Sequence, residues 1–147
     1  MFKLLTTLYV LILSISIGMA NSDFENAQET IAMSTIYAAN HFDSVRGIAC
    51  LTESGTTPLL MSRLSSGLPI FALSEHSSTL QRLALRRGVV PLYFESAAFE
   101  RDEIEIRALE FLRDEGLIQK GDSIILTQGS LMGVTGSTNI IKILSVS

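Results

Sequence analysis

The segment Thr52-Glu-Ser-Gly-Thr-Thr57 combines several hydroxyl side chains with a glycine, and Pro58 and an apolar run follow it. The residues before it have the composition of a buried strand, so the segment lies where a strand turns into a helix. Free N–H groups at a helix start attract anions, Gly55 lets the backbone approach a ligand, and hydroxyls add donors. The segment therefore predicts a phosphate-sized binding loop. A plain helix start, with Ser54 or Thr57 as the cap, is the alternative.

A second loop with the same chemistry lies near the end of the chain, in Gly133-Val-Thr-Gly-Ser-Thr-Asn139. Its glycines permit tight turns, and its side chains supply hydrogen-bonding groups that suit a loop closing over an anion. An ordinary hairpin turn explains the same residues. We therefore keep both interpretations.

Hydrophobic periodicity and turn residues predict alternating strands and helices around these loops. Strands are expected at 45–51, 70–73, 89–94, 123–127 and 140–146, and helices at 26–41, 58–64, 77–86 and 102–115. Pro91 cannot donate to a strand ladder, which places the third strand at a sheet edge. The connection between the last two strands is too short for a crossover helix, so these strands are antiparallel. The expected fold class is α/β, a single three-layer domain with a mostly parallel five-stranded sheet and an antiparallel last strand.

In such a sheet the loops after parallel strands open at one edge, where ligands bind. The segments 52–57 and 74–77 should therefore share a crevice with the loop before the last strand. His76 borders this edge, either as a ligand contact or as an exposed loop residue. No paired carboxylates, metal-spaced ligands or ordered nucleophile and base emerge, so we predict neither catalytic residues nor a metal site.

Composition limits the function further. The chain has 147 residues, 47% of them hydrophobic, which suits one domain, and its net charge of −4 argues against nucleic-acid binding. Arg82, Arg86 and Arg87 form the one basic cluster, which we expect on a solvated helix face. Cys50 is the sole cysteine and reads as a buried core thiol.

Residues 1–20 differ from the rest of the chain, and we treat 21–147 as the folded domain. The leader has a basic start, an apolar run and small residues at its end, which is a secretory-signal pattern. An uncleaved membrane anchor and an upstream sequence fused in frame by accident are the alternatives. Export or membrane association would follow from the first two.

Several further segments occur in one order along the chain, and together they resemble the C-terminal domain of pyruvate kinase, closest to its bacterial branch. They are Ser65-Ser-Gly-Leu-Pro-Ile-Phe-Ala72, Leu83-Ala-Leu-Arg-Arg-Gly-Val-Val-Pro91, Lys120-Gly-Asp122, Thr127-Gln-Gly129 and Gly136-Ser-Thr-Asn139. The resemblance runs from about Asp23 to Ser147. The catalytic barrel of the family needs roughly 250 residues and does not fit before Asp23. The resemblance thus implies a stand-alone regulatory domain that is inactive by itself and, by family, cytoplasmic.

The resemblance also implies a ligand. In pyruvate kinases this domain holds a sugar phosphate between a Thr-x-Ser-Gly-x-Thr loop and a glycine-rich loop near the C-terminus. The residues expected to bind the phosphate are Thr52, Ser54, Gly55, Thr56, Thr57, Gly136, Ser137 and Thr138. Glu53 and Thr56 replace basic side chains of some family members, and each lost charge-assisted hydrogen bond costs roughly 1.5–3 kcal/mol. A sugar monophosphate is therefore expected rather than a bisphosphate, with Lys142 or Arg63 as candidate cations.

The family reaction moves phosphate from phosphoenolpyruvate to ADP, giving pyruvate and ATP, with magnesium and potassium in the barrel, so no cofactor is expected in this chain. One alternative function is an interaction module, in which residues 26–41 and the last strand pair with a second copy or with a full-length kinase. Others are a non-functional truncated gene product and an exported phosphate-ligand binder.

Overall fold

The computed structural model describes residues 26–64, 66–131 and 133–147. The leader 1–20 lies outside these residues. Within them, no helix has both the length and the apolar composition needed to cross a membrane. The elements in chain order are α2 Ala27–His41, β1 Val45–Leu51, α3 Thr56–Ser62, β2 Ile70–Ser74, α4 Ser77–Leu83, β3 Val89–Tyr93, η1 Ser96–Ala98, α5 Ile104–Asp114, β4 Ser123–Gly129 and β5 Thr138–Ser145.

The strands form one five-stranded sheet in the order β3-β2-β1-β4-β5. β1, β2, β3 and β4 run parallel, and β5 is antiparallel to β4. Pro91 lies on β3, one of the two edge strands of this sheet, opposite Ala72. Both the antiparallel last strand and the edge position of the proline-containing strand were predicted from the sequence, and both are confirmed.

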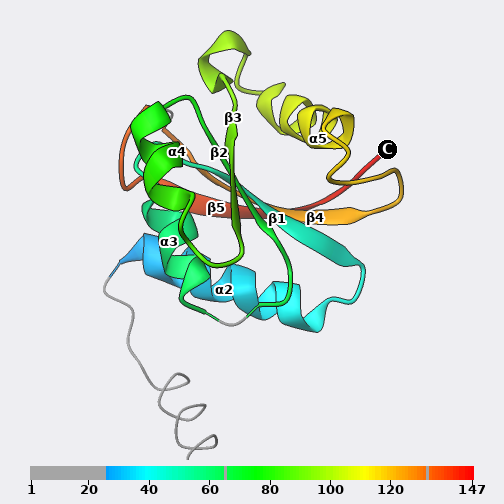
Figure 1. Cartoon of the computed structure of the whole chain (residues 1–147). Helices are drawn as coiled ribbons and strands as arrows, with labels where there is room; N and C mark the ends of the chain where they lie inside the picture. Colours follow the sequence, from blue (N-terminus) through cyan, green and yellow to red (C-terminus); the bar gives the residue numbers. More distant parts are fainter. Residues whose placement is uncertain (1–25, 65, 132) are drawn as a thin grey trace, which may run out of the picture.

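Helices cover both faces of the sheet, which gives the predicted three layers (Figure 1). On one face, Ala32 and Ile36 of α2, Met61 of α3 and Leu83 of α4 belong to a core that includes Ile48 of β1. On the other face lies α5. Its buried residues are Ile104, Ala108 and Leu112, and the strand residues beneath it include Ala49, Leu73, Ile124 and Leu126. The parallel strands are apolar on both sides because each side faces a helix.

The start of α2 follows its sequence signal. The Asn26 side-chain oxygen accepts a hydrogen bond from the Glu29 N–H at 3.1 Å, so Asn26 caps the helix as its spacing indicates. The helix ends at His41, where the Phe42 N–H still donates to the Ala38 carbonyl at 3.0 Å.

The other three helices differ from their predicted bounds, and α5 is shorter than the predicted 102–115 at both ends. α3 begins at Thr56, and Gly55 is its N-cap in the left-handed region, with φ of 78°. Neither Ser54 nor Thr57 is the cap, because the left-handed turn at Gly55 makes the residue after Ser54 the cap and places Thr57 inside the helix. α4 ends at Leu83 rather than at Arg86, because the chain tightens into a turn in which the Arg86 N–H donates to the Leu83 carbonyl at 2.9 Å.

Candidate functional site

Three loops meet at the edge of the sheet where β1 and β2 end, as the sequence predicts. They follow β1, follow β2 and connect β4 to β5, and they line one pocket together with the start of α2. Its lining residues are Gln28, Leu51, Thr52, Glu53, Ser54, Leu73, Ser74, Glu75, Ser96, Gln128, Gly129, Leu131, Val134, Gly136, Ser137 and Thr138. The cavity volume is about 40 Å³. That is room for a few water molecules, so the cavity is smaller than a metabolite.

The loop after β1 is held by its own hydroxyl groups. Thr52 Oγ1 accepts a hydrogen bond from the Gly55 N–H at 2.9 Å, and Ser54 Oγ lies 2.9 Å from Thr56 Oγ1. A side chain on Gly55 would lie 3.1 Å from Thr79 Cγ2, in addition to being strained at a positive φ. The loop is therefore preformed, and glycine is required at its turn.

Thr57 ties this loop to the end of the β4–β5 connection. Its side chain is fully buried, and Thr57 Oγ1 donates to Thr138 Oγ1 at 3.0 Å across 81 residues of sequence. Gln28 Nε2 of α2 lies 3.4 Å from the same Thr57 oxygen. Thr57 and Thr138 thus hold the two loops together, and their hydroxyls already have partners.

The β4–β5 loop is also bonded internally. Ser137 Oγ lies 2.9 Å from the Leu131 carbonyl and 2.8 Å from the Val134 carbonyl, and the Ser130 N–H donates to Asn139 Oδ1 at 2.9 Å. Gly136 takes a φ of 75°, which glycine adopts without strain. These contacts shape a closed loop above the pocket.

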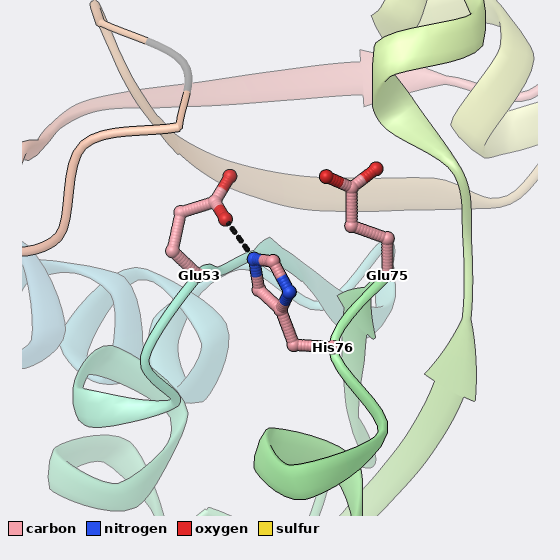
Figure 2. Close-up of side chains that lie close together, drawn as sticks. All are labelled: Glu53, Glu75 and His76. Carbon is pink, nitrogen blue, oxygen red and sulfur yellow. Dashed lines mark hydrogen bonds and ion pairs between the residues drawn. The ribbon is translucent and has the colours of Figure 1, made fainter.

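Glu53 links all three loops through its carboxylate. One oxygen, Oε2, lies 2.6 Å from His76 Nε2, and the other, Oε1, accepts the Gly133 N–H at 3.2 Å. Figure 2 shows the Glu53 carboxylate and the His76 ring joined in this way, with Glu75 beside them. The Glu53 carboxylate therefore places a negative charge between the loop after β1 and the glycine-rich loop.

Arg82, which the sequence analysis assigned only to a solvated face, brings a positive charge next to the loop after β1. Arg82 is exposed, as expected, but its Nη2 donates to the Ser54 carbonyl at 3.0 Å. The two cations suggested from sequence lie elsewhere: Lys142 pairs with Glu105 at 2.5 Å, and Arg63 lines a different cavity beside Gly67 and Arg87. Among the described residues, none that lines the first pocket is Lys or Arg, and Glu53 and Glu75 both do.

The eight residues expected to bind phosphate divide into two groups. Thr52, Ser54, Gly136, Ser137 and Thr138 line the pocket. Gly55, Thr56 and Thr57 shape the loop behind it. Sequence reasoning predicted that these loops meet, because parallel strands must end at a common edge. It missed the contacts of Glu53 and Arg82, although Glu53 and His76 each follow one of two neighbouring strands and could have been paired on that ground.

Cys50 takes no part in this site. It is fully buried on β1, and burial raises the pKa of its thiol to about 12. The thiol is therefore protonated at neutral pH, which is the state of a core residue rather than of a nucleophile.

Comparison with known proteins identifies a family for most of the chain. A sequence model described as the pyruvate kinase alpha/beta domain matches residues 29–144. Pyruvate kinase II of Salmonella typhimurium is 51% identical over 123 residues, which is 84% of this chain and 25% of that protein.

Two further relatives give the same result. Pyruvate kinases of Buchnera aphidicola subsp. Schizaphis graminum and of Haemophilus influenzae are 46% and 45% identical over 129 and 127 residues. Each alignment covers 86% of this chain and 26% of the relative, so the chain spans about a quarter of the length of the relatives that it matches. Four fifths of the chain thus carries this family's sequence pattern on the fold described above, and the chain belongs to the pyruvate kinase alpha/beta domain family.

Proposed function

We propose that this domain binds a phosphorylated metabolite, a sugar monophosphate above all, in the pocket between the loop after β1 and the β4–β5 loop. The observation that carries the proposal is the meeting of three sequence-distant loops at the C-terminal edge of the parallel strands. Ligands of open α/β sheets bind at this edge. Membership of the pyruvate kinase family supports a regulatory role for such binding, and the activity regulated would be phosphate transfer from phosphoenolpyruvate to ADP.

The contacts that hold the loops suggest how a ligand would bind. The Thr57–Thr138 contact fixes the base of the glycine-rich loop, whereas its tip is held to the loop after β1 by the Gly133 N–H on Glu53. A phosphate group would compete with the Glu53 carboxylate for that N–H, because both are anions. The tip then opens and enlarges the cavity, while Thr138 stays in place.

Charge favours a monophosphate over a bisphosphate. Glu53 and Glu75 line the pocket, and each repels phosphate. Arg82 lies beside Ser54 with further N–H donors of its guanidinium group available, since Arg carries five and one atom contacts the loop carbonyl. A single phosphate near Arg82 is therefore the best electrostatic match.

Thermal unfolding of the 147-residue chain, with and without hexose and pentose monophosphates, a hexose bisphosphate and nucleotides, tests the proposal. A ligand that binds only the native state raises the midpoint, and a 100-fold excess over Kd adds about 2.7 kcal/mol. We expect a rise with a monophosphate that Arg82→Met reduces and that Arg63→Met, the matched change in a different cavity, leaves unchanged. No rise with any compound, or equal loss in both variants, would contradict the proposal.

We also propose that α2 and β5 form a pairing surface, because large apolar side chains are exposed on both. Tyr37 on α2 is 68% exposed and Ile143 on β5 is 53% exposed. Among the described residues, β5 pairs with β4 alone, so its outer edge can accept a further strand. The partner would be a second copy or a full-length kinase. Light scattering tests this directly: Ile143→Lys should convert a dimer into a monomer, and a monomeric parent chain would refute homodimer formation.

A further inference from the structure

We propose that Glu53, Glu75 and His76 form a binding site for a divalent transition-metal ion, with Zn²⁺ as the best match. One donor atom from each of the three lies within 4.8 Å of the others. Figure 2 shows the His76 ring between the two carboxylates, all three side chains reaching into the same space. The site shares Glu53 and Glu75 with the lining of the proposed phosphate pocket, and His76 is its third side chain.

The donor set points to a transition metal. Two carboxylates and one imidazole supply mixed oxygen and nitrogen ligands, and imidazole favours Zn²⁺ and its neighbours over Mg²⁺ or Ca²⁺. Zinc sites with three protein ligands leave a fourth position for water or another oxygen ligand. Because Glu53 and Glu75 line the pocket, that position would be open to a molecule bound there.

The distances require only small side-chain movements. Ligands at about 2.0–2.2 Å from a tetrahedral Zn²⁺ lie roughly 3.3–3.5 Å from one another. His76 Nε2 and Glu53 Oε2 are hydrogen-bonded at 2.6 Å and would separate slightly as the ion replaces the hydrogen between them. The Glu75 carboxylate would move closer by rotation about its side-chain bonds, without change to the backbone.

Two further observations fit a metal ligand set better than a simple surface ion pair. Glu53 Oε1 accepts the Gly133 N–H, so a neighbouring loop orients the carboxylate in the way that groups around a metal orient its ligands. Glu75 is half-buried, and within the described part of the chain its carboxylate has no hydrogen-bond or ion-pair partner. A cation between Glu53 and Glu75 would give the Glu75 carboxylate a partner.

A metal at this position would also change the charge of the pocket. The lining residues carry two carboxylates and, among those described, no Lys or Arg. A divalent cation balances both carboxylates and offers a phosphate oxygen its open position. Metal binding itself does not depend on phosphate binding, since it needs only the three side chains.

The test uses Zn²⁺ alone, with no phosphate compound present. Isothermal titration of the metal-free 147-residue chain with Zn²⁺ should show one site, and Co²⁺ should give the visible absorption of a low-symmetry complex. We expect His76→Gln and Glu75→Gln each to weaken Zn²⁺ binding about tenfold or more. His41→Gln, which removes the other histidine, should leave it unchanged.

Circular dichroism of each variant separates loss of ligands from loss of fold. Equal Zn²⁺ affinity in the parent chain and in both folded ligand variants would overturn the inference, as would Mg²⁺ binding as tightly as Zn²⁺. Thermal shifts with sugar monophosphates in EDTA are measured separately. A rise in the unfolding midpoint with phosphate but no zinc binding would refute the metal site and leave the proposed function standing. Zinc binding without any such rise would support the metal site and contradict the proposed function.

Discussion

Replacing Thr57 by valine removes the hydroxyl that joins the loop after β1 to the start of β5 and keeps the side-chain shape. Thr57 is 0% exposed and Thr138 is 6% exposed, so both oxygens are shielded from water. The substitution leaves Thr138 Oγ1 without its donor at 3.0 Å, and a buried polar group that loses its partner costs about 1–3 kcal/mol. The Gln28 contact, at 3.4 Å, is long and adds little. We expect the free energy of unfolding to fall by about 2 kcal/mol.

Thr35→Val is the matched control. Thr35 lies on α2 and is also 0% exposed, but among the described residues its Oγ1 has no hydrogen-bond partner. Valine there removes a buried hydroxyl that forms no bond, so stability should stay the same or rise by up to about 1 kcal/mol. Urea unfolding followed by far-ultraviolet circular dichroism measures the free energy of unfolding of both variants, with equal dependence on urea concentration. Equal losses in the two variants would refute the claim that the Thr57–Thr138 contact holds the loops together.

Substitutions of Gly55 and Cys50 test the turn before α3 and the burial of the thiol. Gly55→Ala should lower the free energy of unfolding by about 1–3 kcal/mol, because φ is 78° and the new methyl group would lie 3.1 Å from Thr79. Gly67→Ala, where the methyl group meets open space, should be close to neutral in the same urea experiment. Cys50 should resist thiol reagents at pH 8 until the chain unfolds, which a timed thiol assay would reveal. The pKa of Cys50 is raised from 9.0 to about 12 in the folded state, so the folded chain keeps a proton that the unfolded chain loses. The free energy of unfolding should therefore fall by up to about 2 kcal/mol between pH 8 and 10.5. The pH slope should be smaller in Cys50→Ala, and an unchanged slope would contradict the assignment.

The sequence predicted much of the fold because the signals were local. Alternating apolar strands, the Asn26 cap and the proline in β3 each fix an element or its place through rules that act over a few residues. The start of α3 was predicted wrongly, since hydroxyl residues surround Gly55 and only the backbone angle selects glycine as the cap. Helix ends depend on such details of the turn.

The sequence predicted which loops lie together but not which side chains contact one another. Parallel strand order brings the ends of β1 and β2 together, which the pattern of the sequence already implies. Which side chains then meet depends on rotamers and on tertiary packing. Glu53 reaches both His76 and Gly133, at separations of 23 and 80 residues, and no periodic pattern encodes either pairing.

Backbone amide chemical shifts during titration with a sugar monophosphate show where the ligand binds. The N–H of Gly133 leaves Glu53 if phosphate replaces the carboxylate, so it should shift most, together with the amides of 52–56 and 136–138. The opposite edge of the sheet, at 66–70 and 87–90, should not respond. Shifts confined to that opposite edge, or none at saturating ligand, would contradict the account.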